Sequence, residues 1–234
     1  MSLNKIAIIP ARGGSKRIPG KNIKSFEGRP IISYSITAAI DSKLFDEVMV
    51  STDDHEIATI ALQYGATVPF LRSHKASDDF ASTEDVILEV ITQYHSSGKQ
   101  FEVGCCIYPT APFATVKLIQ DGFHLLDSGS FDTVFPVVQF DYPIQRSLQF
   151  SDKGKIEMVW PQYLDSRSQD LPNRFHDTGM FYWFRTHQFL EDKKLFGENS
   201  GAIIISELQC HDIDTTDDWE MAEIKYRRLK NLKK

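Results

Sequence analysis

A short loop near the N-terminus combines glycines with basic side chains. Residues 11–22 read Ala-Arg-Gly-Gly-Ser-Lys-Arg-Ile-Pro-Gly-Lys-Asn and directly follow the apolar run Ile6–Ile9. Glycine lets backbone N–H groups approach an anion closely, and arginine and lysine neutralise its charge. The loop matches neither G-x-x-x-x-G-K-S/T nor G-x-G-x-x-G, the two standard phosphate-binding patterns. We therefore expect a polyphosphate site of another kind; the alternative is an ordinary glycine turn with solvated charges.

Two aspartates near the C-terminus occupy alternate positions in His211-Asp212-Ile213-Asp214. We expect the run Leu208–Ile213 to be a strand, in which a period of two puts both carboxylates on one face. Two like charges that lie close together favour a cation between them, and Mg²⁺ combines a few carboxylates with phosphate oxygens. The alternative is that Asp214 caps the next helix and Asp212 is a solvated surface charge.

Two further polar clusters precede predicted helices. In Ser51-Thr52-Asp53-Asp54 we expect Thr52 or Asp53 to cap the helix that begins at Asp54, and we favour this role for Asp53 over ligand binding. Ser82-Thr83 with Asp85 is typical of an N-cap arrangement. A helix N-terminus is also a site for anions or nucleotides, so the two roles of Ser82 are compatible.

Polar side chains also gather in residues 166–183, ahead of an aromatic strand. They are Arg167, Gln169, Arg174, His176 and Asp177. An arginine can form a bidentate pair with a sugar carboxylate, and the other side chains could bind hydroxyl or N-acyl groups. The alternative is a structural loop with stacked aromatic rings.

Strand-like runs alternate with helical segments as far as Phe140. The expected strands are Ile6–Ile9, Glu47–Ser51, Val68–Leu71, Val103–Tyr108 and Thr133–Val138, and the expected helices are Pro30–Ile40, Asp54–Tyr64, Thr83–Tyr94 and Thr115–Leu126. This order predicts parallel βαβ units, and the continuous apolar strands indicate that both faces of the sheet are covered. We predict one α/β domain over residues 1–234, with ligands at the carboxyl ends of its strands.

The alternation stops in residues 141–176, which contain three prolines and few helix signals. Gln145–Phe150 and Lys155–Trp160 flank an Asp-Lys-Gly turn and predict a β-hairpin. Such a hairpin is too small to be stable alone, so we expect it to pack on the parent domain or on a second subunit. The predicted elements that follow are a strand at Gly179–Phe184, a helix at Thr186–Asp192, a strand at Ala202–Ser206 and a final helix at Thr216–Lys230, capped by Thr215 or Thr216.

Composition limits the class of protein. The 234 residues carry a formal net charge of −6, which argues against nucleic acid or an anionic membrane as the main partner. No apolar run approaches the length of a membrane span, and we expect no signal peptide because Met1–Lys5 leads directly into a core strand. The cysteines, Cys105, Cys106 and Cys210, are odd in number and lack a framework spacing, so we expect a reduced cytoplasmic protein in which Cys105 and Cys106 are core thiols.

The first loop resembles the N-terminal signature of the sugar-acid cytidylyltransferases, the family that includes CMP-sialic acid synthetases. The matching segments are Ala11–Lys16, Ile18-Pro19 and Lys21–Ile23. The resemblance implies a three-layer Rossmann-like nucleotide-diphospho-sugar transferase fold with a mostly parallel sheet. It also implies that the loop wraps the triphosphate of CTP. The nucleotide-binding residues implied in this way are Arg12, Gly13, Ser15, Lys16, Lys21, Asn22, Arg72 and Ser82.

The family carries an Asp-x-Asp just before its last helix and uses it to bind Mg²⁺. The resemblance therefore assigns Mg²⁺, with Mn²⁺ as an option, to Asp212 and Asp214. The implied catalytic residues are Arg12, Lys21, Asp212 and Asp214. In the family reaction, CTP and a nine-carbon ketosugar acid give the CMP-sugar and pyrophosphate. The hairpin of the family reaches across a homodimer, so the resemblance implies a dimerisation arm within residues 141–176.

A second set of motifs resembles the pseudaminic acid branch of this family. It comprises Cys105–Tyr108, Ser168–Pro172 and the pattern His-Asp-x-Gly-x-Phe-Tyr-Trp at residues 176–183. Sialic acid synthetases usually have glutamine where this chain has Tyr108, which argues against N-acetylneuraminic acid as the substrate. The implied sugar-binding residues are Tyr108, Arg167, Gln169, His176 and Asp177, with His176 also a candidate base. The alternatives are a legionaminic, N-acetylneuraminic or Kdo-like acid as substrate, or a non-catalytic nucleotide-binding homologue.

Overall fold

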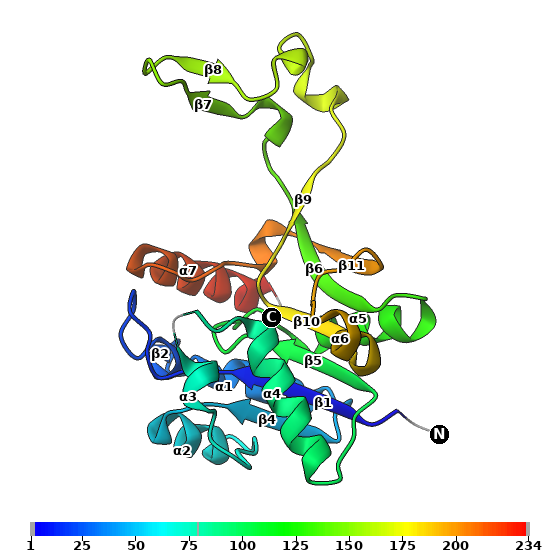
Figure 1. Cartoon of the computed structure of the whole chain (residues 1–234). Coiled ribbons are helices and arrows are strands. Elements are labelled where there is room, and N and C mark those ends of the chain that lie inside the picture. The colour runs from blue at the N-terminus through cyan, green and yellow to red at the C-terminus, as the bar shows by residue number, and fades with distance from the viewer. Residues whose placement is uncertain (1–2, 79, 233–234) are drawn as a thin grey trace.

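A seven-stranded sheet forms the centre of the molecule in the computed structural model, which describes residues 3–78 and 80–232 (Figure 1). Six strands lie side by side in the order β11-β6-β10-β5-β1-β4, and β9 pairs with β6. The strands are β1 (Lys5–Pro10), β4 (Glu47–Ser51), β5 (Val103–Ile107), β6 (Thr133–Gln139), β9 (Phe175–Asp177), β10 (Phe181–Arg185) and β11 (Ser200–Ile205). Only β9 and β10 run antiparallel to their described neighbours, so the predicted mostly parallel sheet is confirmed.

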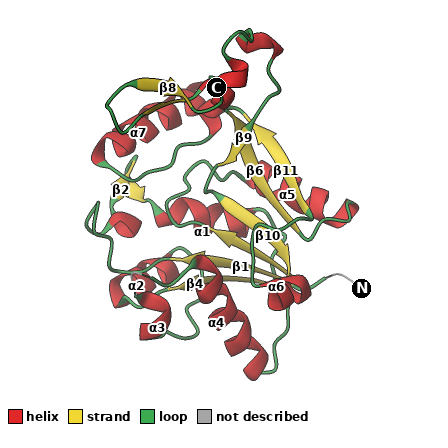
Figure 2. Ribbon diagram, turned by 45° about the horizontal axis from the view of Figure 1, so that its top comes forward, coloured by secondary structure: helices red, strands yellow, loops and turns green. Residues whose placement is uncertain are grey.

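Helices cover both faces of this sheet (Figure 2). The α-helices are α1 (Ile32–Asp41), α2 (His55–Gln63), α3 (His74–Ser77), α4 (Thr83–Ser96), α5 (Val116–Ser128), α6 (Thr186–Asp192) and α7 (Thr216–Leu232). Buried side chains of α1, α2, α5 and α7 pack on one face, and those of α4 and α6 pack on the other. The fold is therefore the three-layer α/β arrangement expected from the sequence. No helix among the described residues is long and apolar enough to span a bilayer.

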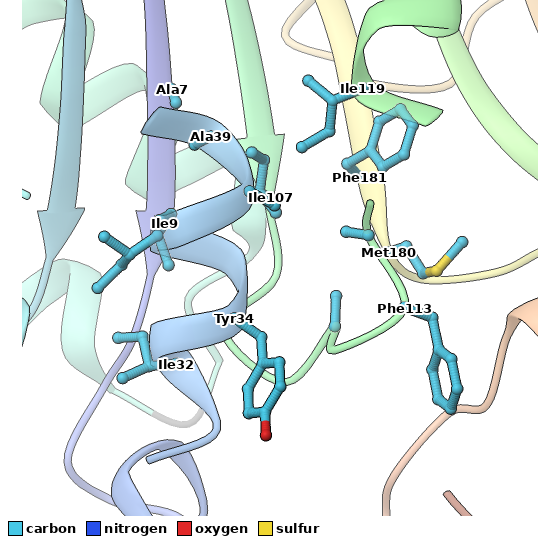
Figure 3. Close-up of a cluster of buried hydrophobic side chains, with 14 of the residues drawn as sticks. Ala7, Ile9, Ile32, Tyr34, Ala39, Ile107, Phe113, Ile119, Met180 and Phe181 are labelled. Carbon is cyan, nitrogen blue, oxygen red and sulfur yellow. The ribbon is translucent and has the colours of Figure 1, made fainter. Parts of the chain in front are cut away.

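The two cores follow from the alternation of side chains along each strand. In β1, Ala7 and Ile9 belong to the first cluster, while Ile6 and Ile8 belong to the second. Figure 3 shows part of the first cluster, where the side chain of Ile32 lies near Ile9. Burial of a side chain such as isoleucine contributes about 1.5–3 kcal/mol, so the strand that precedes the first loop is firmly fixed.

Three predicted element boundaries were wrong. Pro30 lies in the small hairpin formed by β2 (Ser25–Phe26) and β3 (Arg29–Pro30), and α1 begins two residues later. Val68–Leu71 forms no strand; the adjacent Thr67 makes only an isolated bridge to Met49. Leu208–Ile213 pairs with no strand either, because the chain forms a short 3-10 helix, Glu207–Gln209, directly after β11.

The segment between β6 and β9 projects from the body (Figure 1). It contains the predicted hairpin, formed by β7 (Leu148–Phe150) and β8 (Ile156–Met158). Several apolar side chains of this segment, among them Leu148, Phe150 and Ile156, are exposed. An isolated hairpin is marginally stable in water, and here its apolar side chains contact little of their own chain.

Candidate active site

The first loop follows β1 at the carboxyl end of the parallel strands, where ligands bind in open α/β sheets. Together with Tyr108, Pro109 and Thr110, which follow β5, it lines a pocket of about 390 Å³. A pocket of this size falls in the range of small-molecule sites. The loop faces the pocket with Arg12, Ser15, Lys16, Arg17 and Lys21. The structure thus brings the expected phosphate-binding cations to one cavity.

Backbone contacts fix the loop at its start. The N–H of Ala11 donates to the carbonyl of Ser51 at 2.9 Å, and the N–H of Gly13 donates to Asp53 Oδ1 at 2.9 Å. Asn22 is 5% exposed, and its Nδ2 donates to the carbonyl of Arg12 at 2.9 Å. Asn22 therefore shapes the loop from behind, in addition to lining the pocket where a nucleotide contact was expected.

The predicted cap of α2 was wrong by one residue. Asp54 caps this helix, since its Oδ1 accepts from the N–H of Glu56 at 2.7 Å and of Ile57 at 3.1 Å. Asp53 instead holds Gly13. A Cβ added at Gly13 would lie 2.7 Å from Asp54 Oδ2, which is closer than real Cβ contacts. Glycine is therefore required here because the loop crosses directly over the cap of α2.

The two C-terminal aspartates lie beside this loop, although they are not in a strand. Ile213 is 1% exposed and anchors the segment, and its carbonyl accepts from Lys21 Nζ at 2.6 Å. Asp214 Oδ2 lies 2.7 Å from Arg17 Nη1, and Asp214 Oδ1 lies 3.6 Å from Lys21 Nζ. Asp212 is exposed. The predicted association of the acidic pair with the basic loop is thus present at Asp214.

Asp214 is not a helix cap, because Thr215 has that role for α7. The N–H of Asp218 donates to Thr215 Oγ1 at 3.2 Å. In return, Asp218 Oδ2 accepts from the N–H of Thr215 at 2.7 Å and of Asp214 at 3.1 Å. Hydrogen bonds from Thr215 lower the pKa of Asp218, and the one from its side-chain hydroxyl has the largest effect. The carboxylate of Asp214 thereby stays directed to the loop.

The donor set of Asp212 and Asp214 fits Mg²⁺. This ion usually takes one or two protein carboxylates and completes its shell with water and substrate phosphates. No group of three or more His, Cys, Asp or Glu side chains that could hold a metal occurs within residues 3–78 and 80–232. A metal at this pair would thus need phosphate oxygens as further ligands, and the adjacent loop is suited to hold them.

Arg72 and Ser82 both make structural hydrogen bonds, Arg72 to Ser51 at the end of β4 and Ser82 at the start of α4. Arg72 is 7% exposed; its Nε donates to Ser51 Oγ at 3.0 Å and its Nη2 to the carbonyl of Ser51 at 2.5 Å. Burial lowers the pKa of this guanidinium. Ser82 caps α4 in a capping box with Asp85, as predicted, and the bonds from Ser82 lower the pKa of Asp85.

Tyr182 lies next to both Tyr108 and Asp177. The hydroxyl of Tyr108 bonds to Thr83 Oγ1 at 2.8 Å, and its ring meets Tyr182 edge-on at 6.1 Å. Burial raises the pKa of both tyrosines, and the negative charge of Asp177 raises that of Tyr182 further. Both tyrosines are therefore neutral near pH 7. Nδ1 of His176 lies 2.7 Å from the carbonyl of Asp177.

Arg167 and Gln169 belong to the projecting segment and do not join the pocket of their own chain (Figure 1). Arg167 Nε pairs with Asp170 Oδ2 at 2.7 Å. Gln169 lines a separate pocket of about 340 Å³, where residues 139–143 and 168–174 meet. Of the five expected sugar-binding residues, only Tyr108 lines the pocket of the first loop; Arg167, Gln169, His176 and Asp177 do not.

Sequence reasoning gave no role to Arg17 and a wrong one to Asp53. Arg17 was visible as one of four cations in the loop, but nothing in its spacing singled out Asp214 as its partner. Asp53 was visible at the carboxyl end of a strand. Its contact with Gly13 joins residues 40 positions apart, so local sequence could not indicate it.

Comparison with known proteins agrees with this geometry. Residues 6–192 match a family model described as cytidylyltransferase. The chain belongs to the cytidylyltransferase family. It is 39% identical to a pseudaminic acid cytidylyltransferase of Campylobacter jejuni, over 96% of this chain and 97% of the relative. It is 28% identical to a CMP-N,N'-diacetyllegionaminic acid synthase of Legionella pneumophila, over 93% and 94% of the two chains.

The fold of this cytidylyltransferase also resembles a solved one. A CMP:2-keto-3-deoxy-manno-octonic acid synthetase, solved as a complex with CTP, aligns with a TM-score of 0.69. The alignment covers 96% of this chain and 99% of the synthetase, at 15% identity. At that identity the likeness supports the fold alone, and it agrees with the three-layer fold expected from the first loop.

Proposed function

We propose that this protein transfers CMP from CTP to the anomeric hydroxyl of pseudaminic acid, giving CMP-pseudaminic acid and pyrophosphate. The observation that carries the proposal is the pocket lined by the basic loop and the Tyr108–Thr110 segment, two of whose cations, Arg17 and Lys21, pair with the carboxylate of Asp214. The Campylobacter jejuni relative, at 39% identity over almost the whole chain, supports pseudaminic acid as the sugar. The Legionella pneumophila relative makes a legionaminic acid the second candidate.

The reaction requires little covalent chemistry from the protein. The oxygen of the anomeric hydroxyl attacks the α-phosphorus and gives up its proton to a base, for which His176 is the candidate. The bond from that phosphorus to the bridging oxygen breaks, and its electron pair leaves with pyrophosphate. Catalysis of such transfers is mostly positioning and stabilisation of charge. We assign stabilisation of the triphosphate to Arg12, Lys16 and Lys21, whose loop is rigidly placed by Asp53 and Asn22.

We propose Mg²⁺ as the metal and Asp212 and Asp214 as the residues that would hold it. When bound, it supplies Lewis-acid polarisation of the phosphate oxygens. Lys21 donates to the carbonyl of Ile213 between the two aspartates, and it thereby keeps them beside the loop. Arg72 supports the loop indirectly. It donates to the carbonyl of Ser51, which also accepts from the N–H of Ala11 at the start of the loop.

We place the sugar between the nucleotide pocket and the strand β9, against Tyr108, His176 and Asp177. Tyr182 lies close enough to Asp177 for the charge of that carboxylate to raise its pKa, so this wall presents polar groups to which sugar hydroxyls can bind. Ser82 would face the cytidine at the N-terminus of α4. Arg167 and Gln169 would reach a sugar only from a second subunit, where Arg167 suits its carboxylate.

We also propose that the protein is a homodimer through its projecting segment. Support comes from Leu148, Phe150 and Ile156, which are 61%, 76% and 55% exposed. Each would gain about 1.5–3 kcal/mol if fully buried on a partner. A cytoplasmic location is proposed on two grounds: CTP is the co-substrate, and all three cysteines are free and buried.

Pyrophosphate release tests the proposed reaction. CTP and Mg²⁺ are supplied with pseudaminic, legionaminic or N-acetylneuraminic acid, each in a separate assay. Release with pseudaminic acid alone is expected. Release with another acid would retain the mechanism and replace the substrate, whereas no release with any acid would overturn the proposal.

The dimer has its own test in two matched variants. Ile156→Asp places a charge on β8 of the projecting segment, and Ile204→Asp places one on β11, where Ile204 is 66% exposed. We expect the first to give monomers and to lose turnover, and the second to stay dimeric. Light scattering after size exclusion measures the mass of each. A dimeric Ile156→Asp variant, or a monomeric wild type, would contradict the proposal.

A further inference from the structure

The carboxylate proposed to hold the metal is already occupied by two cations of the first loop. Arg17 Nη1 lies 2.7 Å from Asp214 Oδ2, and Lys21 Nζ lies 3.6 Å from Asp214 Oδ1. Each oxygen of Asp214 therefore faces a positive charge. The cluster of Asp214, Arg17 and Lys21 therefore carries one negative and two positive side chains. A divalent cation gains little by approaching a site that carries no net negative charge.

The two cations differ in how easily they can leave. The side chain of Lys21 is 19% exposed, and its Nζ also donates to the carbonyl of Ile213 at 2.6 Å. The side chain of Arg17 is 68% exposed, and it lies in a loop with no regular secondary structure. Exposed ion pairs contribute little to stability, so Arg17 can leave Asp214 for another partner at little cost in free energy. Lys21 is the fixed member and Arg17 the exchangeable one.

A triphosphate in the adjoining pocket offers Arg17 a better partner than Asp214. Arg17 lines the same pocket as Arg12 and Lys16. A phosphate chain presents several anionic oxygens, and a planar guanidinium can bind two of them at once. Movement of Arg17 to the phosphate would expose Asp214 Oδ2 at the moment when phosphate oxygens become available as further metal ligands.

We propose that the ion pair with Arg17 blocks Asp214 while the pocket is empty, so that Mg²⁺ binds at this carboxylate together with the triphosphate and not before it. The inference rests on the proposed function, because it takes Asp214 as a metal ligand and a triphosphate as the occupant of the pocket. In this role Arg17 is a positioning residue: it keeps the carboxylate directed to the loop and yields it when the nucleotide binds.

Binding of Mg²⁺ to the protein without nucleotide tests whether Arg17 blocks Asp214. Isothermal titration compares the wild type with Arg17→Gln and with Arg17→Lys, which keeps the charge. One positive charge about 5 Å from a divalent cation at an exposed site corresponds to roughly a tenfold change in affinity. We expect Arg17→Gln to bind Mg²⁺ about tenfold more tightly than the wild type, and Arg17→Lys to bind it nearly as the wild type does.

Two controls make the result specific. Arg228→Gln removes the same charge from an exposed position on α7, and we expect it to leave the Mg²⁺ affinity unchanged. The double variant Arg17→Gln/Asp214→Asn should lose the gain. If Arg17→Gln binds Mg²⁺ no better than Arg228→Gln does, or if the gain survives in the double variant, the inference is overturned.

A titration at saturating CTP tests the exchange itself. If the triphosphate has drawn Arg17 away, the wild type and Arg17→Gln should then differ less than about threefold in Mg²⁺ affinity, since the removed charge no longer faces the metal. An undiminished tenfold difference would overturn the exchange. These measurements need no turnover. If Arg17 blocks Asp214 as expected in a protein that releases no pyrophosphate with any sugar acid, the proposed reaction alone is refuted.

Discussion

Replacement of Gly13 by alanine should disturb both the first loop and the start of α2. The added Cβ would lie 2.7 Å from Asp54 Oδ2 and 3.0 Å from Asp54 Cβ. If Asp54 moves, α2 loses the carboxylate that accepts from Glu56 and Ile57. If the loop moves instead, Gly13 loses its bond to Asp53. One of the two contacts must therefore weaken.

The size of the effect follows from these two contacts. Loss of an aspartate cap costs about 1 kcal/mol, and loss of a hydrogen bond to a charged group costs about 1.5–3 kcal/mol. We expect Gly13→Ala to lower the free energy of unfolding by about 2 kcal/mol, which is roughly 4–8 °C in Tm for a chain of this size. We also expect weaker binding of CTP, because the displaced loop carries Arg12 and Lys16.

Thermal unfolding followed by circular dichroism gives the first quantity, and calorimetric titration with CTP gives the second. Gly14→Ala is the matched control, because a Cβ at Gly14 would meet no atom within 4 Å; its Tm should stay near that of the wild type. In an Asp54→Ala background, where Oδ2 is absent, Gly13→Ala should cost less than it does alone. The reasoning is refuted if Gly13→Ala matches Gly14→Ala in both Tm and CTP affinity.

Three further outcomes are expected. Asp214→Ala should abolish pyrophosphate release while the circular dichroism spectrum stays that of the wild type; unchanged turnover would exclude Asp214 as a metal ligand. Ser82→Ala should lower stability by about 1 kcal/mol in denaturant unfolding, through loss of the cap of α4. Hydrogen bonds from Ser82 lower the pKa of Asp85 in the folded state, so the unfolded chain binds more protons in acid. The stability that Asp85 contributes is therefore fully present above pH about 4 and is lost as the pH falls through the pKa of Asp85 in the folded protein. Asp85→Asn should therefore show a shallower loss of stability in acid than the wild type, and an equally steep loss would contradict the linkage.

The order of elements could be predicted because burial leaves a strong local pattern. β1 and β5 contain continuous apolar runs in the sequence; β5 is buried throughout its length, and β1 is buried at its four central residues. The caps of α4 and α7 could also be predicted, since Ser82 and Thr215 act on residues three positions away. Where both the pattern and its partner are local, sequence alone is enough.

One error arises where a distant contact decides between equal local choices. Asp53 and Asp54 are chemically identical candidates for one cap, and only the approach of Gly13 from the first loop separates them. Leu208–Ile213 has a composition compatible with a strand, but Leu208 and Gln209 lie in the short 3-10 helix Glu207–Gln209, which Ser206 caps, and the residues that follow pair with no strand.

Lys21 accounts for how the two halves of the candidate site come together without a strand. It lies 192 positions before Ile213, yet its ammonium donates to the carbonyl of that residue. Ile213 is buried in the core, whereas Asp212 is exposed and Asp214 is partly exposed. One face shared by the two carboxylates stays a prediction, but the backbone between them is held at Ile213 by a buried side chain on one side and by a cation of the first loop on the other.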